Sequence, residues 1–283
     1  MERCPLGHTE LSVSPIGLGT VKLGRTKGLR YPPAQQAARL PNDAEVLTLL
    51  TEAHKLGTTL IDTAPAYGLA EERLGSVLYT IAPRAAWQLC SKAGEEFDED
   101  AGSSTFDYSP AAITRSIDRS LRRLKTDYLD IALLHFATGQ PDEWVLAEGA
   151  AYAALKRLQE AGKARAIGAS PASLAGGLLA VDLCEVAMLT LNTAFAGDLA
   201  AITQASITGC GVMIKKPLAS GHAAAESRAD MAAIAAGETS ADPIQRSLKL
   251  ALAPKAVACA IVGTSNPAHL RQAVLIAELL RGS

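Results

Sequence analysis

Four polar side chains in the first half of the chain have the types needed to move a proton to a carbonyl oxygen: Asp62, Tyr67, Lys92 and His135. A tyrosine with an ordinary pKa of about 10 is a poor acid or base at neutral pH. A buried lysine beside it stabilises the phenolate and lowers that pKa. A carboxylate can hold the lysine charged and in place, and a histidine can orient the carbonyl. Such a group could protonate the oxygen while a hydride arrives at the carbon.

Three of the four residues lie where an apolar run ends. Asp62 closes one run, Lys92 follows another and His135 closes a third, whereas Tyr67 lies in a Pro/Gly turn just after Asp62. Taken singly, each has an ordinary structural explanation as a helix cap, a rim residue or a packed turn. In a (β/α)8 barrel, however, the carboxyl ends of the strands meet at one mouth. Their position at the ends of consecutive runs therefore favours a single catalytic site.

Eight short apolar runs predict the strands that carry these residues. They are residues 16–20, 59–62, 87–91, 129–135, 164–169, 186–191, 212–215 and 256–263. Several are apolar at nearly every position, which is typical of parallel strands buried on both faces. Helical periodicity lies between them, as at 43–56, 110–124, 152–161 and 268–280. We predict an α/β fold, a single (β/α)8 TIM barrel over residues 1–283, with a doubly wound sheet as the alternative.

The longer connections after strands should lie on the C-terminal face of this barrel, where barrel loops bind ligands. They are residues 22–41, 92–109, 136–144 and 220–242. The scarce aromatic residues concentrate on candidate rim positions, namely Tyr31, Tyr67, Phe97, Phe106, Tyr108, Phe136, Trp144 and Phe195. These extended loops match no specificity pattern, so they predict a ligand site without identifying its substrate.

The composition argues against several other classes of protein. Lys and Arg number 27 against 29 Asp and Glu, so no basic excess favours nucleic-acid binding. No apolar run is long enough to span a membrane, and the first residues lack the apolar core of a signal peptide. Five scattered cysteines without a CxxC pair indicate a reduced, cytoplasmic chain and no metal site. The sequence shows no heptad pattern, so it does not indicate an oligomeric state.

The motifs around the four polar residues resemble those of the aldo-keto reductase family. The similar segments are 60–68 with 71–75, 91–92, 127–135 and 165–170, and the resemblance runs from about Ser14 to the C-terminal helix. It implies a (β/α)8 barrel that transfers a hydride between NAD(P)H and an aldehyde, ketone or aldose. Residue by residue, it implies Tyr67 as the proton donor, Lys92 and Asp62 as its support and His135 as the orienting histidine. We expect the small-molecule substrate to contact Tyr67, His135, Trp87 and Phe136.

The same resemblance implies a cofactor site at the barrel mouth. Its expected residues are Gly19, Thr20, Asp62, Ser170, Met188, Lys215, Lys216, Pro217, Leu218, Gly263, Thr264, Ser265, Asn266, His269, Arg271 and Gln272. Asn266 is a predicted N-cap and Pro267 the predicted first residue of a helix whose free amides would attract a phosphate. Lys215, Lys216 and Arg271 favour NADP(H) over NAD(H).

Three positions depart from the family's pattern around the nicotinamide. Pro171 stands where the family has Asn after Ser170, Met188 stands four residues before Asn192 where it has Gln, and Lys215 stands where a Tyr stacks on the ring. These departures leave two alternatives open. One is a nucleotide-binding or regulatory barrel with weak or no turnover. The other is a barrel enzyme that performs cofactor-free proton chemistry.

Overall fold

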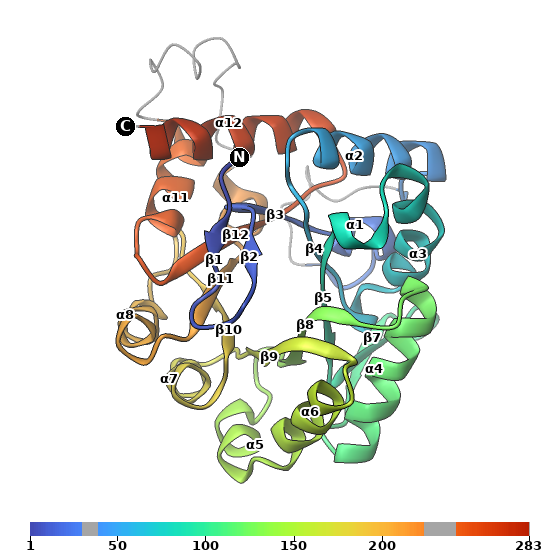
Figure 1. Ribbon diagram of the computed structural model, residues 1–283, viewed down its shortest axis with the longest axis vertical. Helices are drawn as coiled ribbons and strands as arrows, with labels where there is room; N and C mark the ends of the chain where they lie inside the picture. Colours follow the sequence, from blue (N-terminus) through green and yellow to red (C-terminus); the bar gives the residue numbers. More distant parts are fainter. Residues whose placement is uncertain (30–38, 224–241, 283) are drawn as a thin grey trace.

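The strands of the protein close into a parallel barrel in the computed structural model, which describes residues 1–29, 39–223 and 242–282 (Figure 1). Around the barrel the strands are β3 (Ile16–Gly19), β4 (Leu60–Asp62), β5 (Gln88–Ala93), β8 (Leu129–His135), β9 (Ala164–Ser170), β10 (Val186–Thr190), β11 (Gly211–Lys215) and β12 (Val257–Gly263). β12 pairs with β3 to complete the ring. Each predicted apolar run forms one of these strands, so the predicted barrel is confirmed over the doubly wound alternative.

Helices return along the outside of the barrel from each strand to the next, as the ring in Figure 1 shows. They are α2 (Asp43–Lys55), α3 (Ala70–Ile81), α4 (Pro110–Leu124), α5 (Asp142–Glu148), α6 (Ala150–Glu160), α7 (Leu174–Leu183), α8 (Leu199–Thr208), α11 (Pro243–Leu252) and α12 (Pro267–Gly282). Local capping explains where several begin. Asn42 and Glu45 form a capping box at α2, and Ser109 caps α4 ahead of Pro110 at its first position.

Two apolar cores hold the layers together. One lies between the strands and the helices, and the other fills the barrel interior. The N-terminal hairpin of β1 (Cys4–Pro5) and β2 (Ser12–Val13) belongs to the interior core, where Leu6 and Leu11 pack with barrel residues such as Leu60 and Ile131. In Figure 1 this hairpin crosses the middle of the barrel. It closes the N-terminal end, so a ligand enters from the C-terminal ends of the strands.

Smaller elements shape that open end. The predicted loop 92–109 contains an antiparallel hairpin of β6 (Glu95–Asp98) and β7 (Ser103–Phe106). The short helices α1 (Val21–Gly24), η2 (Pro65–Tyr67) and η4 (Ala219–Gly221) also contribute to the open end, whereas η3 (Arg84–Ala86) precedes β5 at the closed end. Residues 30–38 and 224–241, which include Tyr31 and parts of two predicted rim loops, lie outside the described residues, as does 283. A single domain spanning all of 1–283 therefore stays a prediction.

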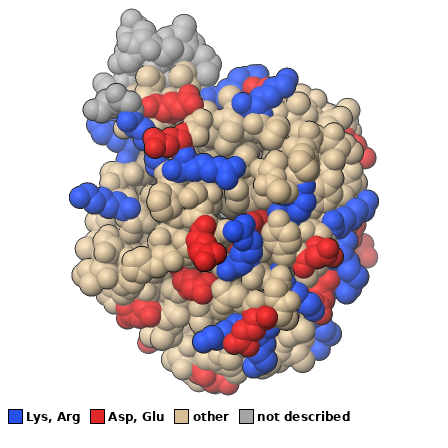
Figure 2. All heavy atoms as spheres, viewed as in Figure 1, with Lys and Arg blue, Asp and Glu red and all other residues tan. Residues whose placement is uncertain are grey.

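The surface carries charges of both signs. On the face drawn in Figure 2, basic and acidic side chains are interspersed rather than gathered into one patch of either sign. Among the described residues, no helix combines the length and apolar character required to cross a bilayer.

Alanine substitutions at two helical glycines test how tightly the helices around the barrel pack. A Cβ added at Gly75 in α3 would lie 2.0 Å from the carbonyl oxygen of Arg123 in α4, so Gly75→Ala forces the two helices apart. We expect it to lower the free energy of unfolding by about 2 kcal/mol. A Cβ at Gly177 in α7 would meet its nearest neighbours at an ordinary 3.4 Å. We expect Gly177→Ala to be neutral or to stabilise by up to about 1 kcal/mol through helix propensity. Urea unfolding followed by circular dichroism compares them, and equal stability of both variants would contradict this packing.

Candidate active site

A buried ion pair lies at the floor of the barrel mouth. Lys92 on β5 donates a short hydrogen bond to Asp62 at the end of β4, and another to the carbonyl oxygen of Thr63 at 2.9 Å. Lys92 is 1% exposed and Asp62 3%. Burial by itself would lower the pKa of Lys92, but the charges of Asp62 and Tyr67 outweigh burial and raise that pKa. Lys92 therefore stays a cation at every physiological pH.

Tyr67 places its hydroxyl against this pair. Lys92 Nζ lies 3.3 Å from Tyr67 Oη. The short helix η2 turns the chain directly after β4, and α1 packs against the tyrosine's backbone. A Cβ at Gly24 would lie 2.2 Å from the Tyr67 carbonyl oxygen, and Gly68 has φ of 60°. Both positions require glycine for the turn to bring the phenol over the lysine.

His135, the last residue of β8, faces the same space. Its ring meets that of Tyr67 edge-on, with centroids 6.1 Å apart. Burial lowers the pKa of His135 well below its ordinary value, and the positive charges of Lys92 and Lys215 lower it further. Nδ1 lies 3.1 Å from Glu95 Oε2 without forming a hydrogen bond. His135 is therefore a neutral imidazole at the pH of the cell.

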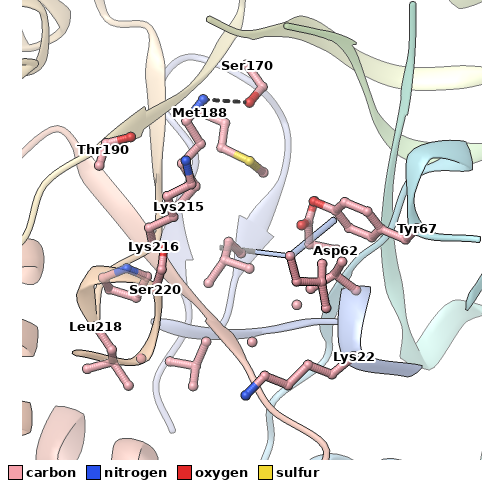
Figure 3. A pocket seen from close by; sticks show the side chains of 18 of the residues that line it. Lys22, Asp62, Tyr67, Ser170, Met188, Thr190, Lys215, Lys216, Leu218 and Ser220 are labelled. Atoms are coloured by element: carbon pink, nitrogen blue, oxygen red, sulfur yellow. Dashed lines mark hydrogen bonds between the residues drawn. The ribbon is translucent and has the colours of Figure 1, made fainter. Parts of the chain in front are cut away.

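These four residues border one large cavity at the mouth of the barrel. Its volume is about 1020 Å³, at the upper end of the range for small-molecule sites. Figure 3 shows Tyr67 and Asp62 on one side and Met188, Ser170 and Lys215 on the other. From this floor the cavity extends past Gly19 and Thr20 to His269 and Gln272 at the start of α12. The four polar residues predicted from the sequence thus meet around a site open to solvent.

Comparison with known proteins identifies the family. Residues 15–280 match the Aldo/keto reductase family. The chain belongs to this family. Aldo-keto reductases are oxidoreductases that use a nicotinamide cofactor, either NADP(H) or NAD(H).

Individual relatives agree with this assignment. The chain is 34% identical to L-galactose dehydrogenase of Arabidopsis thaliana over 58% of its own length and 46% of that protein, and 32% identical to the NADH-specific methylglyoxal reductase of Escherichia coli over 60% and 52%. It spans about half the length of the curated relatives it matches. A solved structure from Pseudomonas aeruginosa, assigned to the aldo-keto reductases, is 39% identical with a TM-score of 0.81, covering 99% of this chain and 95% of that one. An aldo-keto reductase from Bacillus halodurans, 23% identical over 98% and 91%, has the same fold with a TM-score of 0.78.

Most residues that the aldo-keto reductase resemblance predicted for the cofactor line the cavity. They are Gly19, Thr20, Asp62, Ser170, Met188, Lys215, Lys216, Pro217, Leu218, Gly263, Thr264, His269 and Gln272. Of the predicted substrate contacts, Tyr67, His135 and Phe136 also line it. Asn266 caps α12 as expected, accepting from the backbone N–H of Ala268 at 2.9 Å, and the helix begins at Pro267.

Four predicted positions lie elsewhere. Trp87 precedes β5 at the closed end of the barrel and packs against His54, so the prediction of a substrate contact there is wrong. Arg271 points outward from α12 and pairs with Glu52 of α2 at 2.9 Å, so it does not face the cavity. Ser265 and Asn266 line a second cavity of about 570 Å³ between the starts of α2 and α12.

The sequence interpretation missed several polar residues of the cavity wall. Glu95 lies beside His135, and Arg25 reaches the carbonyl oxygen of Ala66 at 3.0 Å while stacking on Phe97. Lys22 borders the cavity from α1. All three belong to segments that were expected only as rim loops. No regular spacing marked them, because their positions depend on α1 and on the β6–β7 hairpin.

The neutral state of His135 is directly measurable. Because burial and nearby cations both disfavour the imidazolium, we expect the ring to stay neutral from about pH 8 down to about pH 6. Nitrogen-15 NMR of the histidine rings measures this, with His135→Gln used to assign the signal. A His135 titration with a midpoint near the ordinary value of about 6.5 would contradict the burial and charge environment described above.

Proposed function

We propose that this aldo-keto reductase reduces a small carbonyl compound with a nicotinamide cofactor, and that Tyr67 exchanges the proton with the substrate oxygen. The observation that carries the proposal is the contact of 3.3 Å between Lys92 Nζ and Tyr67 Oη beneath an open cavity. A lysine held charged by Asp62 stabilises the phenolate that remains when the tyrosine gives up its proton. The same contact serves the reverse reaction, in which the phenolate accepts a proton from an alcohol.

His135 orients the carbonyl group in this proposal. A neutral imidazole can donate one hydrogen bond without competing for the proton that Tyr67 delivers. The two rings lie edge-on with their centroids 6.1 Å apart, and both residues line the cavity. In this proposal a carbonyl oxygen bound between them would receive a hydrogen bond from His135 and the proton from Tyr67. The hydride would come from the nicotinamide when the cofactor is bound.

The chemistry of the cavity wall fits a dinucleotide. A nicotinamide cofactor has an uncharged or singly positive ring at one end and negative phosphates further along. Lys22 and Lys216 line the cavity and offer positive charge to a pyrophosphate, while His269, whose pKa is lowered by burial and by the charge of Lys22, offers a hydrogen-bonding ring. Ser170 and Lys215 offer polar groups to the carboxamide, and Met188 offers an apolar surface to the ring.

We propose that NADP(H) is preferred over NAD(H). A site for NAD typically offers an acidic residue to the free ribose hydroxyl, as the Rossmann fold does. Among the described residues that line the cavity, the acids are Asp62 and Glu95, and both lie at the catalytic floor. Lys22 and Lys216 supply positive charge instead, although Arg271 does not contribute to this preference.

The proposed substrates are aldehydes, small ketones or aldoses. Arg25, Glu95 and Thr138 give the cavity wall hydrogen-bonding groups, and Phe136 and Phe195 give it apolar surface. This mixture suits a compact polar carbonyl compound. Relatives include L-galactose dehydrogenase, D-arabinose 1-dehydrogenase and a methylglyoxal reductase, which supports sugars and small aldehydes as the first compounds to test.

A cytoplasmic location stays a prediction.

Two observations disfavour the alternatives. A protein that only binds a nucleotide has no need of a tyrosine supported by a buried lysine, and that support is intact here. A barrel without a cofactor has no need of the basic groups along the outer cavity. Tight binding of NADPH with no turnover on any carbonyl would nevertheless favour the regulatory alternative over the enzyme.

Removal of the phenol hydroxyl tests the role of Tyr67. We expect Tyr67→Phe to lower kcat for carbonyl reduction by about 1,000-fold, because general acid catalysis contributes about 100- to 10,000-fold. Cofactor affinity should change little, since the hydroxyl is needed for proton transfer. Oxidation of NADPH measured with a panel of aldehydes and aldoses gives the rates. Tyr128→Phe is the matched control, because Tyr128 lies at the opposite end of the barrel beside Arg84. Full turnover by Tyr67→Phe would overturn the proposal.

Cofactor preference has its own test. We expect NADPH to bind at least about tenfold more tightly than NADH, because its additional phosphate gains charge-assisted hydrogen bonds from Lys22 or Lys216, apart from the two acids at the catalytic floor. Isothermal titration calorimetry with each cofactor measures the two dissociation constants. Equal or tighter binding of NADH would overturn the preference and leave the rest of the proposed function intact.

A further inference from the structure

Lys215 is a second lysine in the cavity, and its surroundings differ from those of Lys92. It is the last residue of β11, and its side chain crosses the barrel mouth to β9. There Nζ donates to Ser170 Oγ at 3.1 Å and to the carbonyl oxygen of Pro171. Both acceptors are uncharged. The hydrogen bonds therefore hold the amine in place without neutralising its positive charge.

The position of Lys215 brings that charge close to the reaction centre. Figure 3 shows Lys215 and Met188 across the cavity from Tyr67 and Asp62. The field of Lys215 reaches His135, where it contributes to lowering the histidine's pKa. A hydride donor must sit within contact distance of a carbonyl carbon whose oxygen is held at Tyr67. A productively bound nicotinamide would therefore lie in the space between Tyr67 and the Lys215 side of the cavity.

The two oxidation states of the cofactor differ at this point by one charge. The reduced nicotinamide ring is neutral, and the oxidised ring carries one positive charge. A positively charged ring bound in this partly buried site would be repelled by a charged Lys215, since the effective dielectric constant there is well below that of water. Asp62 does not relieve the repulsion, because Lys92 occupies its carboxylate.

We propose that Lys215 makes this site discriminate between the two cofactor forms, favouring the reduced one, and that Lys215 gives up its proton to solvent when the oxidised form binds. The proposal deepens the proposed function and rests on it. This discrimination would favour one direction of the reaction. The site would hold NAD(P)H well and release NAD(P)+ readily, which suits carbonyl reduction rather than alcohol oxidation.

The protonation behaviour of Lys215 agrees with this role. Burial lowers the pKa of Lys215 to about 7, with a smaller lowering from the charge of Lys216 and from Lys92, while Asp198 and Asp142 act in the opposite direction. His135 is neutral and adds no charge, and Lys92 stays charged across the whole range. Because the pKa is lowered, Lys215 is charged below about pH 7 and largely neutral above about pH 8. The discrimination should accordingly be strong in mild acid and fade in mild base.

Charge-removing variants test the proposal through binding alone. Lys215→Met keeps the length of the side chain without a donor, and Lys215→Gln keeps a polar donor without a charge. Lys249→Met is the matched control, because Lys249 is exposed on α11 and does not line the cavity. Calorimetry with NADPH and NADP+, and with NADH and NAD+, at about pH 6 and about pH 8.5 gives the ratio of oxidised to reduced dissociation constants. Circular dichroism confirms that each variant is folded.

We expect the ratio at about pH 6 to be at least about tenfold larger in the unaltered protein than in either Lys215 variant, and the difference to shrink at about pH 8.5. Lys249→Met should behave as the unaltered protein. Titrations in buffers of different ionisation enthalpy should also show release of a proton when the oxidised form binds near pH 6, and none from Lys215→Met.

Each other outcome has a distinct meaning. If both variants weaken the binding of both cofactor forms equally and leave the ratio unchanged, Lys215 has only a structural role in linking β11 to β9. The inference is then wrong, while the proposed function stands. If the ratio does not depend on pH in the unaltered protein, the inference is also wrong. If none of the four nucleotides binds, the proposed function fails and the inference fails with it.

Discussion

The buried ion pair between Lys92 and Asp62 is the interaction on which the rest of the site depends. Taking two charges out of water is costly, and removing one partner of such a pair typically costs about 3–5 kcal/mol because the other is left unpaired. The adjacent strands β4 and β5 provide the positions at which the two side chains meet. The turn after β4 then sets Tyr67 over the lysine, and the N-terminal hairpin closes the far end of the barrel beneath them.

Two lysines in one cavity show how surroundings decide the behaviour of a residue type. Lys92 contacts a carboxylate and its pKa is raised, whereas Lys215 contacts a hydroxyl and a carbonyl oxygen and its pKa is lowered to about 7. The first is a fixed cation suited to stabilising a phenolate. The second can change its charge near neutral pH. One cavity therefore combines a permanent charge beside the proposed proton donor with a variable charge on the opposite wall.

The sequence predicts the barrel well because each strand is an uninterrupted apolar run, and Asp62 and His135 follow from the ends of those runs. Side-chain direction is harder to predict. Arg271 is two residues from His269 along α12, about 200° around the helix, so the two face opposite sides. Trp87 is five residues before Lys92, about 16 Å along a strand and thus at the other end of the barrel. The positions of Glu95 and Arg25 depend on the β6–β7 hairpin and on the short helix α1, and no periodic pattern in the sequence predicted either element.

In the proposed reaction a hydride passes from the cofactor to a carbonyl carbon above the tyrosine that Lys92 supports. Turnover of an aldehyde such as methylglyoxal with NADPH deuterated at the transferable position of C4, followed by mass spectrometry of the product alcohol, tests it most directly. Hydride transfer predicts one deuterium on the new carbinol carbon. An alcohol product without deuterium, or no alcohol from any aldehyde or aldose while NADPH is bound, would contradict it.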